Sequence, residues 1–161
     1  MKLVQVLTRN FPAVFGDDYY DDPKTGGRIT FEKRARRMAL MYEGRAQSSG
    51  GLLRTLSSIE KIGPISDYRV PQALSAMGIL HYGQELHKKI IAQAVFQKNS
   101  HEELSIRAGT LIVVKKFLDG INDVRCEYGV PQIHMGHADY FLWSCARTMG
   151  NRHHITQTTA Y

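Results

Sequence analysis

The sequence predicts an all-α protein, a bundle of helices with hardly any strand. Apolar residues recur at helical spacing along most of the chain, helix-start residues precede several of these stretches, and strand signals are nearly absent. The 161 residues suit one ordinary domain, and no linker, repeat or low-complexity tract divides them. We therefore expect residues 1–161 to form a single helical domain.

The first half of the chain contains three predicted helices and one predicted loop. Residues 3–11 fit a helical stripe slightly better than a strand, and residues 52–62 are predicted to form a short helix that stops at Gly63. The acidic stretch GDDYYDDPKTGGR, residues 16–28, has the Asp, Pro and Gly content of a surface loop. Thr30 is the predicted N-cap of the next helix. The apolar residues predicted on or near one face of that helix, with Arg and Lys opposite, are Phe31, Ala35, Met38, Leu40, Met41 and Tyr42.

A junction between loop and helix is predicted in the segment SDYRVPQ. Pro71 favours an extended backbone at Val70, which places Asp67, Tyr68 and Arg69 just before the helix that follows. Helical patterns then cover residues 73–80 and 83–96. The side chains of the second pattern that we expect to face inward are Leu86, Ile90, Ile91 and Val95.

The most apolar helix of the chain is predicted to begin at a capping box. Ser100 accepts a hydrogen bond from the amide of Glu103 in such a box, and the Glu103 side chain returns the bond. The helix that follows, residues 104–121, ought to be central, and its Arg107 needs an anionic partner if it is buried. Residues 122–137 carry turn signals, residues 138–149 form the last predicted helix, and the tail is polar without a strong period.

The formal charge of +6 predicts a surface that attracts anions such as nucleotide phosphate, nucleic acid or acidic lipid. The local cluster of basic residues consists of Lys33, Arg34, Arg36 and Arg37. This cluster is either a solvated helix face or a phosphate contact. No apolar run suffices for a membrane span, the start is a poor secretory signal, and the sequence has two cysteines. We expect a cytoplasmic protein with free thiols.

The spacing of the histidines does not support metal chemistry. His134 and His137, like the pair His153 and His154, lack the i, i+4 spacing of a helical zinc site, and no Cys pair has zinc spacing. Surface and capping roles suit these histidines better. We expect no metal and no other cofactor.

Two aspartates each have two possible interpretations, one structural and one functional, because an ionised carboxylate in such surroundings needs a partner or a chemical role. Asp139 in HADYFLW is either an N-cap or first-turn acid favoured by the helix dipole, or a tuned base beside a stacked nucleobase. Asp67 either pairs with Arg69 to fix the loop before the proline, or converges with Arg69 on a polar ligand with Tyr68 as a wall.

Four segments carry a resemblance to a known family: TFEKRAR, SDYRVPQALSAMGILHYGQEL, EELSIRAG and DYFLW. In this order they are similar to the C-terminal half of the queuosine salvage family, the queuosine 5'-phosphate N-glycosylase/hydrolases. The resemblance extends over nearly the whole chain. It implies an all-helical fold similar to that of the helix-hairpin-helix DNA glycosylases. It also implies hydrolysis of the N-glycosidic bond of queuosine 5'-monophosphate, which releases queuine for tRNA modification.

The resemblance also implies roles for individual residues. Asp139 would act in catalysis or base recognition, and Asp67 in the region of the sugar and the leaving group. The residues implied for substrate binding are Tyr68, Arg69, Tyr140, Trp143 and, for the phosphate, Lys33. The partner implied is a small-molecule nucleotide, with no membrane partner and no nucleic acid as substrate.

Two features depart from the family pattern. The family's proteins are longer, and their N-terminal half, with an aromatic segment that lines the pocket, has no counterpart here. We therefore expect a fragment, a shortened form or half of a split protein. Ser144 stands where the family usually has an Asp, which removes one acid from the site. The alternative functions are a non-catalytic module that binds nucleotide or nucleic acid, and a DNA base glycosylase.

Overall fold

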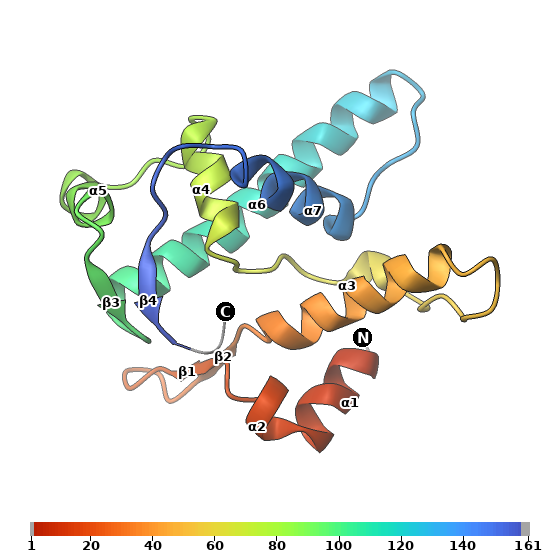
Figure 1. Ribbon diagram of the computed structural model, residues 1–161, viewed down its shortest axis with the longest axis horizontal. Helices are drawn as coiled ribbons and strands as arrows, with labels where there is room; N and C mark the ends of the chain where they lie inside the picture. The colour runs from red at the N-terminus through yellow and green to blue at the C-terminus, as the bar shows by residue number, and fades with distance from the viewer. Residues whose placement is uncertain (1, 159–161) are drawn as a thin grey trace. The chain divides into compact units, whose positions relative to one another are not determined.

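The computed structural model describes residues 2–158 and is mainly helical, as predicted (Figure 1). Over these residues it has seven α-helices, one 3₁₀ turn and four three-residue strands. The chain divides into two compact units, which we call the N-terminal unit (residues 2–65) and the C-terminal unit (residues 66–158). Each unit is described by itself. None of the helices within residues 2–158 combines the length and the apolar content that crossing a membrane requires.

The N-terminal unit is built around one long helix, against which two short helices pack. Its elements are α1 (Lys2–Asn10), α2 (Pro12–Phe15), β1 (Tyr19–Asp21), β2 (Arg28–Thr30), α3 (Lys33–Gln47) and the 3₁₀ turn (Ile59–Lys61). The opening residues, whose pattern favoured a helix only slightly, do form the helix α1. Figure 1 shows α1 and α2 lying along one side of α3.

The acidic stretch is not a loop but a β-hairpin, so this prediction was wrong. Strands β1 and β2 pair antiparallel, with Tyr19 opposite Thr30 and Asp21 opposite Arg28. The Arg28 guanidinium donates to both carboxylate oxygens of Asp21, at 2.6 and 2.9 Å, which lowers the pKa of that carboxyl. The Asp, Pro and Gly residues do make a turn, but β-prone residues such as Ile29 on either side of it complete the hairpin.

Helix α3 begins later than predicted, and its predicted apolar face is only partly right, since Phe31 and Ala35 are buried. Thr30 belongs to β2, and the helix starts at Lys33 after Glu32, whose φ of 52° lies in the left-handed region. Met38 and Met41, predicted on the apolar face, are exposed. The buried positions of the helix are Lys33, Ala35, Ala39, Glu43 and Ala46. Small alanine side chains let the rest of the unit approach the helix closely, which the larger methionines would prevent.

The short helix predicted at residues 52–62 is reduced to the 3₁₀ turn at its end. Side chains of α3 hold the preceding segment in a non-helical path: Glu43 accepts a hydrogen bond from the Leu56 amide at 2.6 Å, and the Tyr42 hydroxyl donates to the Arg54 carbonyl at 3.0 Å. A local helical pattern therefore loses to long-range hydrogen bonds that the sequence does not reveal.

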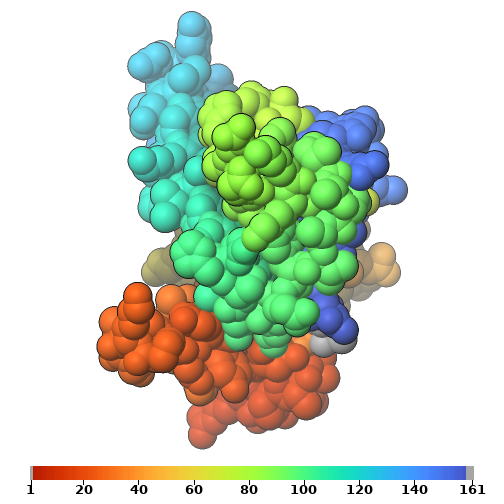
Figure 2. Space-filling model, turned by 90° about the vertical axis from the view of Figure 1, so that its left-hand side faces the viewer, coloured from red at the N-terminus to blue at the C-terminus, as the bar shows by residue number. Residues whose placement is uncertain are grey.

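The C-terminal unit packs three helices together beside a small parallel sheet. Its elements are α4 (Arg69–Ala76), α5 (Gln84–Ile91), β3 (Val95–Gln97), α6 (His101–Glu127), α7 (Met135–Ala146) and β4 (Ile155–Gln157). Helix α4 packs against α7, and both contact the long helix α6 (Figure 1). Figure 2 shows α5, in green, at the surface of this unit.

The polar tail, for which no structure was predicted, contributes strand β4. It pairs parallel with β3, with Val95 opposite Ile155 and Gln97 opposite Gln157. Residues 159–161 of the tail lie outside the described part. Because β3 and β4 are far apart in the sequence, no local pattern predicts that they pair.

The expected inward face of the helix at residues 83–96 is only partly right. Ile90 is buried and packs with Phe96 and Ile106, and Leu86 lies against this cluster. Ile91 and Val95 are about half exposed, at 50% and 57%. Helix α5 ends at Ile91, so residues beyond it leave the helical register on which the prediction depended.

The start of α6 matches one half of the predicted capping box. Ser100 Oγ accepts from the Glu103 amide at 3.3 Å, but the Glu103 carboxylate accepts from the Asn99 amide, at 3.1 Å, and not from that of Ser100. The helix then continues to Glu127, through residues in which turn signals were noted. It is the longest helix of the described chain, and its contacts with α4, α7 and β3 agree with the central position that its apolar pattern predicted.

Candidate active site

Asp67 lies just before α4, and its carboxylate is tied to the first turn of that helix. Its Oδ1 accepts from the Arg69 amide at 2.9 Å, and its backbone carbonyl accepts from the Val70 amide at 3.2 Å. Asp67 and the preceding Ser66 are both buried. The junction predicted from SDYRVPQ is therefore present.

Val70 is helical and not extended, which corrects the prediction made from the proline. Val70 and Pro71 are the second and third residues of α4. The first amides of a helix have no partner within the helix, so a proline there loses no hydrogen bond. Pro71 favours an extended backbone at Val70, but this preference is local, and the hydrogen bonds of the junction outweigh it.

Tyr68 and Arg69 are half-buried at the same junction. The Arg69 guanidinium carbon lies 5.2 Å from the centre of the Tyr68 ring, and Arg69 also donates to Gln72 Oε1 at 3.0 Å. The other neighbour of Tyr68 is the His153 ring, whose centre lies 4.6 Å away. The Tyr68 ring thus has a guanidinium and an imidazole as polar neighbours, the kind of surroundings that a polar ligand requires.

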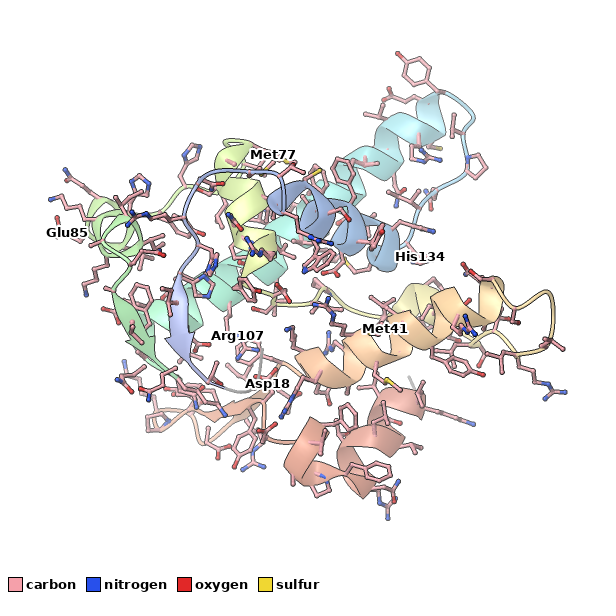
Figure 3. All side chains as sticks on the ribbon, viewed as in Figure 1. Asp18, Met41, Met77, Glu85, Arg107 and His134 are labelled. Atoms are coloured by element: carbon pink, nitrogen blue, oxygen red, sulfur yellow. The ribbon has the colours of Figure 1, made fainter. Side chains whose placement is uncertain are left out.

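Arg107 of α6 has a buried side chain that contacts this junction. Its side chain is 1% exposed, its Nε donates to Ser66 Oγ at 3.2 Å, and its Nη1 lies 3.5 Å from Glu103 Oε1. Glu103 is fully buried. The prediction that a buried Arg107 needs an anionic partner is confirmed, and Figure 3 shows this residue on α6.

His154 is the residue of this cluster that sequence reasoning missed. It is 3% exposed, and its pKa is lowered to about 4, first by burial and then by the positive charges of His153 and Arg107, while Asp67 acts in the opposite direction. The imidazole is therefore neutral near pH 7. The paired histidines in the polar tail were the available signal, but only the path of the tail shows that one of them is buried.

The tail is held in place by α4 and by Gln93, which follows α5. Gln72 and Asn151 exchange two hydrogen bonds, at 2.5 and 3.0 Å, and Gln93 donates to the His153 carbonyl at 3.0 Å. These long-range bonds fix the segment that leads to His154. The cluster of Asp67, Arg107 and His154 is thus assembled from three separate parts of the C-terminal unit.

Asp139 is neither an N-cap nor a first-turn residue, so that reading was wrong. Helix α7 begins at Met135, which makes Asp139 its fifth residue, and the cap is His134, labelled in Figure 3. His134 Nδ1 accepts from the Gly136 amide at 3.1 Å, and His137 Nδ1 accepts from the His134 amide at 3.4 Å. The helix dipole acts within the first turn, so it does not account for a carboxylate at this position.

The aromatic residues of α7 point in different directions. Tyr140 is 70% exposed, whereas Trp143 is half-buried with the Arg147 guanidinium carbon 5.1 Å from its ring centre. Asp139 and Ser144 are also half-buried. Helix α7 packs against α4, so the structure gathers all the site residues predicted on these two helices in one unit.

Lys33 lies in the other unit, and the basic cluster around it is not an open solvated face. Lys33 is 6% exposed, and its amide donates to Asp18 Oδ2 at 3.0 Å. Arg34 pairs with Asp17, and Arg36 lies 3.4 Å from Glu32. Acidic residues of the hairpin region therefore balance much of the charge that the sequence pattern had left facing solvent.

Among residues 2–158, no group of three or more His, Cys, Asp or Glu side chains is placed to hold a metal ion. A hollow of about 560 Å³ occurs in the N-terminal unit, lined by Ala46, Gln47, Gly51, Leu53, Arg54 and Thr55. None of the predicted site residues lines it.

The fold and the cluster define a helical protein with buried carboxylate, guanidinium and imidazole groups, a combination suited to chemistry on a polar small molecule. Over residues 1–161 the chain matches the family model described as queuosine salvage protein, and it belongs to this family. This confirms the resemblance found in the sequence.

The curated relatives bear the name queuosine 5'-phosphate N-glycosylase/hydrolase. The protein of Dictyostelium discoideum is 32% identical over 162 residues, which cover 99% of this chain and 47% of the relative. That of Mus musculus is 31% identical over 153 residues, 91% of this chain and 42% of the relative. That of Sphaerobacter thermophilus is 31% identical over 111 residues, 68% of this chain and 32% of the relative. The chain spans less than half the length of these relatives.

Proposed function

We propose that this chain acts in the hydrolysis of the N-glycosidic bond of queuosine 5'-monophosphate, which releases queuine for tRNA modification. Its family and the names of its relatives support this function. The observation that carries the proposal is the buried carboxylate of Asp67 next to α4, in the unit that also holds Asp139. We include in the proposal a likeness to the helix-hairpin-helix glycosylases and a cytoplasmic location, the latter supported by the free thiols of Cys126 and Cys145.

The reaction needs a negative charge close to the anomeric carbon. As the bond from C1′ to the base nitrogen breaks, its electron pair leaves with the base, which takes up a proton, and C1′ becomes cationic. Water adds to C1′ and gives up a proton, so the products are queuine and ribose 5-phosphate. A carboxylate held by a backbone amide, as that of Asp67 is by the Arg69 amide, stabilises the developing cation without moving.

The other candidate residues would hold the nucleotide. We propose that Asp139 orients water or recognises the base, and that Tyr68 and Trp143 form aromatic walls. Arg69, half-buried beside Tyr68, suits the polar sugar. The residues of the C-terminal unit proposed to bind substrate are Tyr68, Arg69, Tyr140 and Trp143, and the assignment of Lys33 to the phosphate stays a prediction.

The test is to incubate the purified chain with queuosine 5'-monophosphate and to measure queuine by mass spectrometry. A full-length relative serves as the active control. We expect release of queuine, and we expect Asp67→Asn or Asp139→Asn to lower turnover by about a hundredfold or more. Asp123→Asn, a change at an exposed position on α6, is the matched control and should leave turnover unchanged.

No release of queuine by the chain, in the presence of an active control, would show that it does not catalyse the reaction alone. Circular dichroism of each variant separates loss of chemistry from loss of fold. The site does not support the alternative functions. Nucleic acid would contact the basic cluster on α3, but two of its arginines, Arg34 and Arg36, pair with carboxylates. Binding to oligonucleotides that falls steeply with salt and survives both Asp substitutions would favour them.

A further inference from the structure

Arg107 is the largest fully buried side chain among the described residues. Removing a guanidinium from water costs several kcal/mol unless polar groups replace the lost hydration. One partner, Glu103, is on its own helix, one turn away, with Oε1 at 3.5 Å. A second partner is Ser66 Oγ, at 3.2 Å, which belongs to the junction before α4. The guanidinium therefore joins the long helix α6 to this junction.

The contact with Ser66 is important because Asp67 is the next residue. On its C-terminal side, Asp67 is fixed by the amides of Arg69 and Val70, at 2.9 and 3.2 Å. On its N-terminal side, the bond from Arg107 to Ser66 holds the chain. The direction of the Asp67 carboxylate thus depends on α4 at one end and on α6 at the other.

We propose that Arg107 is a positioning residue for Asp67, acting through the hydroxyl of Ser66. This inference rests on the proposed function, in which Asp67 stabilises the cationic sugar. Loss of the bond to Ser66 leaves the ligand contacts of the other residues in place but lets the carboxylate drift from the anomeric carbon. The effect is therefore on turnover and not on substrate binding.

The charges around Arg107 are consistent with this role. Glu103 of the same helix lies 3.5 Å from the guanidinium, and the charge of Arg107 acts on His154, in the segment before β4, together with the charges of His153 and Asp67. Glu103 balances the guanidinium charge, and His154 is neutral near pH 7. Arg107 thus donates to the junction at Ser66 while Glu103 of its own helix offsets its charge.

Ser66→Ala tests the proposal without unbalancing the buried charges. We expect this variant to lower kcat about tenfold, the value of one lost hydrogen bond of about 1.4 kcal/mol, with KM within about twofold of the original. Ser66→Thr keeps the hydroxyl and should restore kcat. Ser75→Ala, a half-buried serine on α4, is the matched control and should have no effect. Arg107→Lys is a second variant, expected to resemble Ser66→Ala where it folds.

Amide hydrogen exchange gives a readout that does not need activity. The Arg69 amide donates to Asp67 Oδ1, so its exchange should become about tenfold faster in Ser66→Ala and return in Ser66→Thr. Unchanged exchange at Arg69 overturns the proposal, whether or not the chain is active. Faster exchange with unchanged kcat overturns the role in the reaction. If the original chain shows no turnover, the proposed function fails, and the exchange data still decide whether Arg107 positions Asp67.

Discussion

The buried imidazole of His154 should make the C-terminal unit lose stability as the pH falls below the ordinary histidine range. Its pKa in the folded chain is about 4, because burial and the charges of His153 and Arg107 outweigh the attraction of Asp67. In the unfolded chain an exposed histidine has a pKa of about 6.5. Between these values the unfolded state binds a proton that the folded state does not, so the folded state is the one that is penalised.

The size of the effect follows from the two pKa values. Above a pH of about 6.5, the pKa in the unfolded chain, His154 does not lower the free energy of unfolding. This free energy falls as the pH drops from about 6.5 to about 4, and below that pH His154 changes it no further. A difference of about 2.5 units at 1.36 kcal/mol per unit amounts to a loss of about 3 kcal/mol over that range.

Urea unfolding at a series of pH values from 7 to 4 measures this loss. The fluorescence of Trp143, the one tryptophan of the sequence, reports on the same unit. His154→Gln cannot titrate, so the difference in stability between the original chain and this variant should change by about 3 kcal/mol over the range. The exposed His87→Gln is the control and should follow the original chain. A difference that is constant with pH would refute the reasoning.

Two glycine substitutions should change the free energy of unfolding in opposite directions. Gly44→Ala, in the exposed interior of α3 with open space at its Cβ, should stabilise by about 0.5 to 1 kcal/mol, whereas Gly16→Ala places a Cβ 3.0 Å from backbone and should cost about 1 to 3 kcal/mol in thermal unfolding. Equal signs would contradict the geometry.

Local chemistry in the sequence was enough to predict most helices. The hydroxyl of Ser100 does cap α6, and the segment around Asp67 does form the start of α4. Both predictions depend on groups within four residues of one another. The motifs around Asp67 and Asp139 were also sufficient to identify the family. Whether residues 1–161 act as one domain stays a prediction.

Predictions failed where distant residues decide the outcome. Residues 52–62 have a helical pattern, but Glu43 of α3 binds the Leu56 amide and keeps them irregular. Met38 and Met41 have the apolar character of a buried face, but the unit packs against the alanines of the same helix. Hydrophobicity shows that a residue tends to be buried, and the shape of the neighbouring elements determines which face is buried.

The sequence by itself determined the helical class, the family and the two aspartates that stand out from their surroundings. The tertiary structure alone decided that Arg107 meets Ser66 and that His154 is buried near Asp67. It also moved Asp139 from the start of α7 to its second turn, where the dipole does not explain a carboxylate. Burial and electrostatic interactions depend on which distant segments are in contact, and composition and periodicity do not show which segments those are.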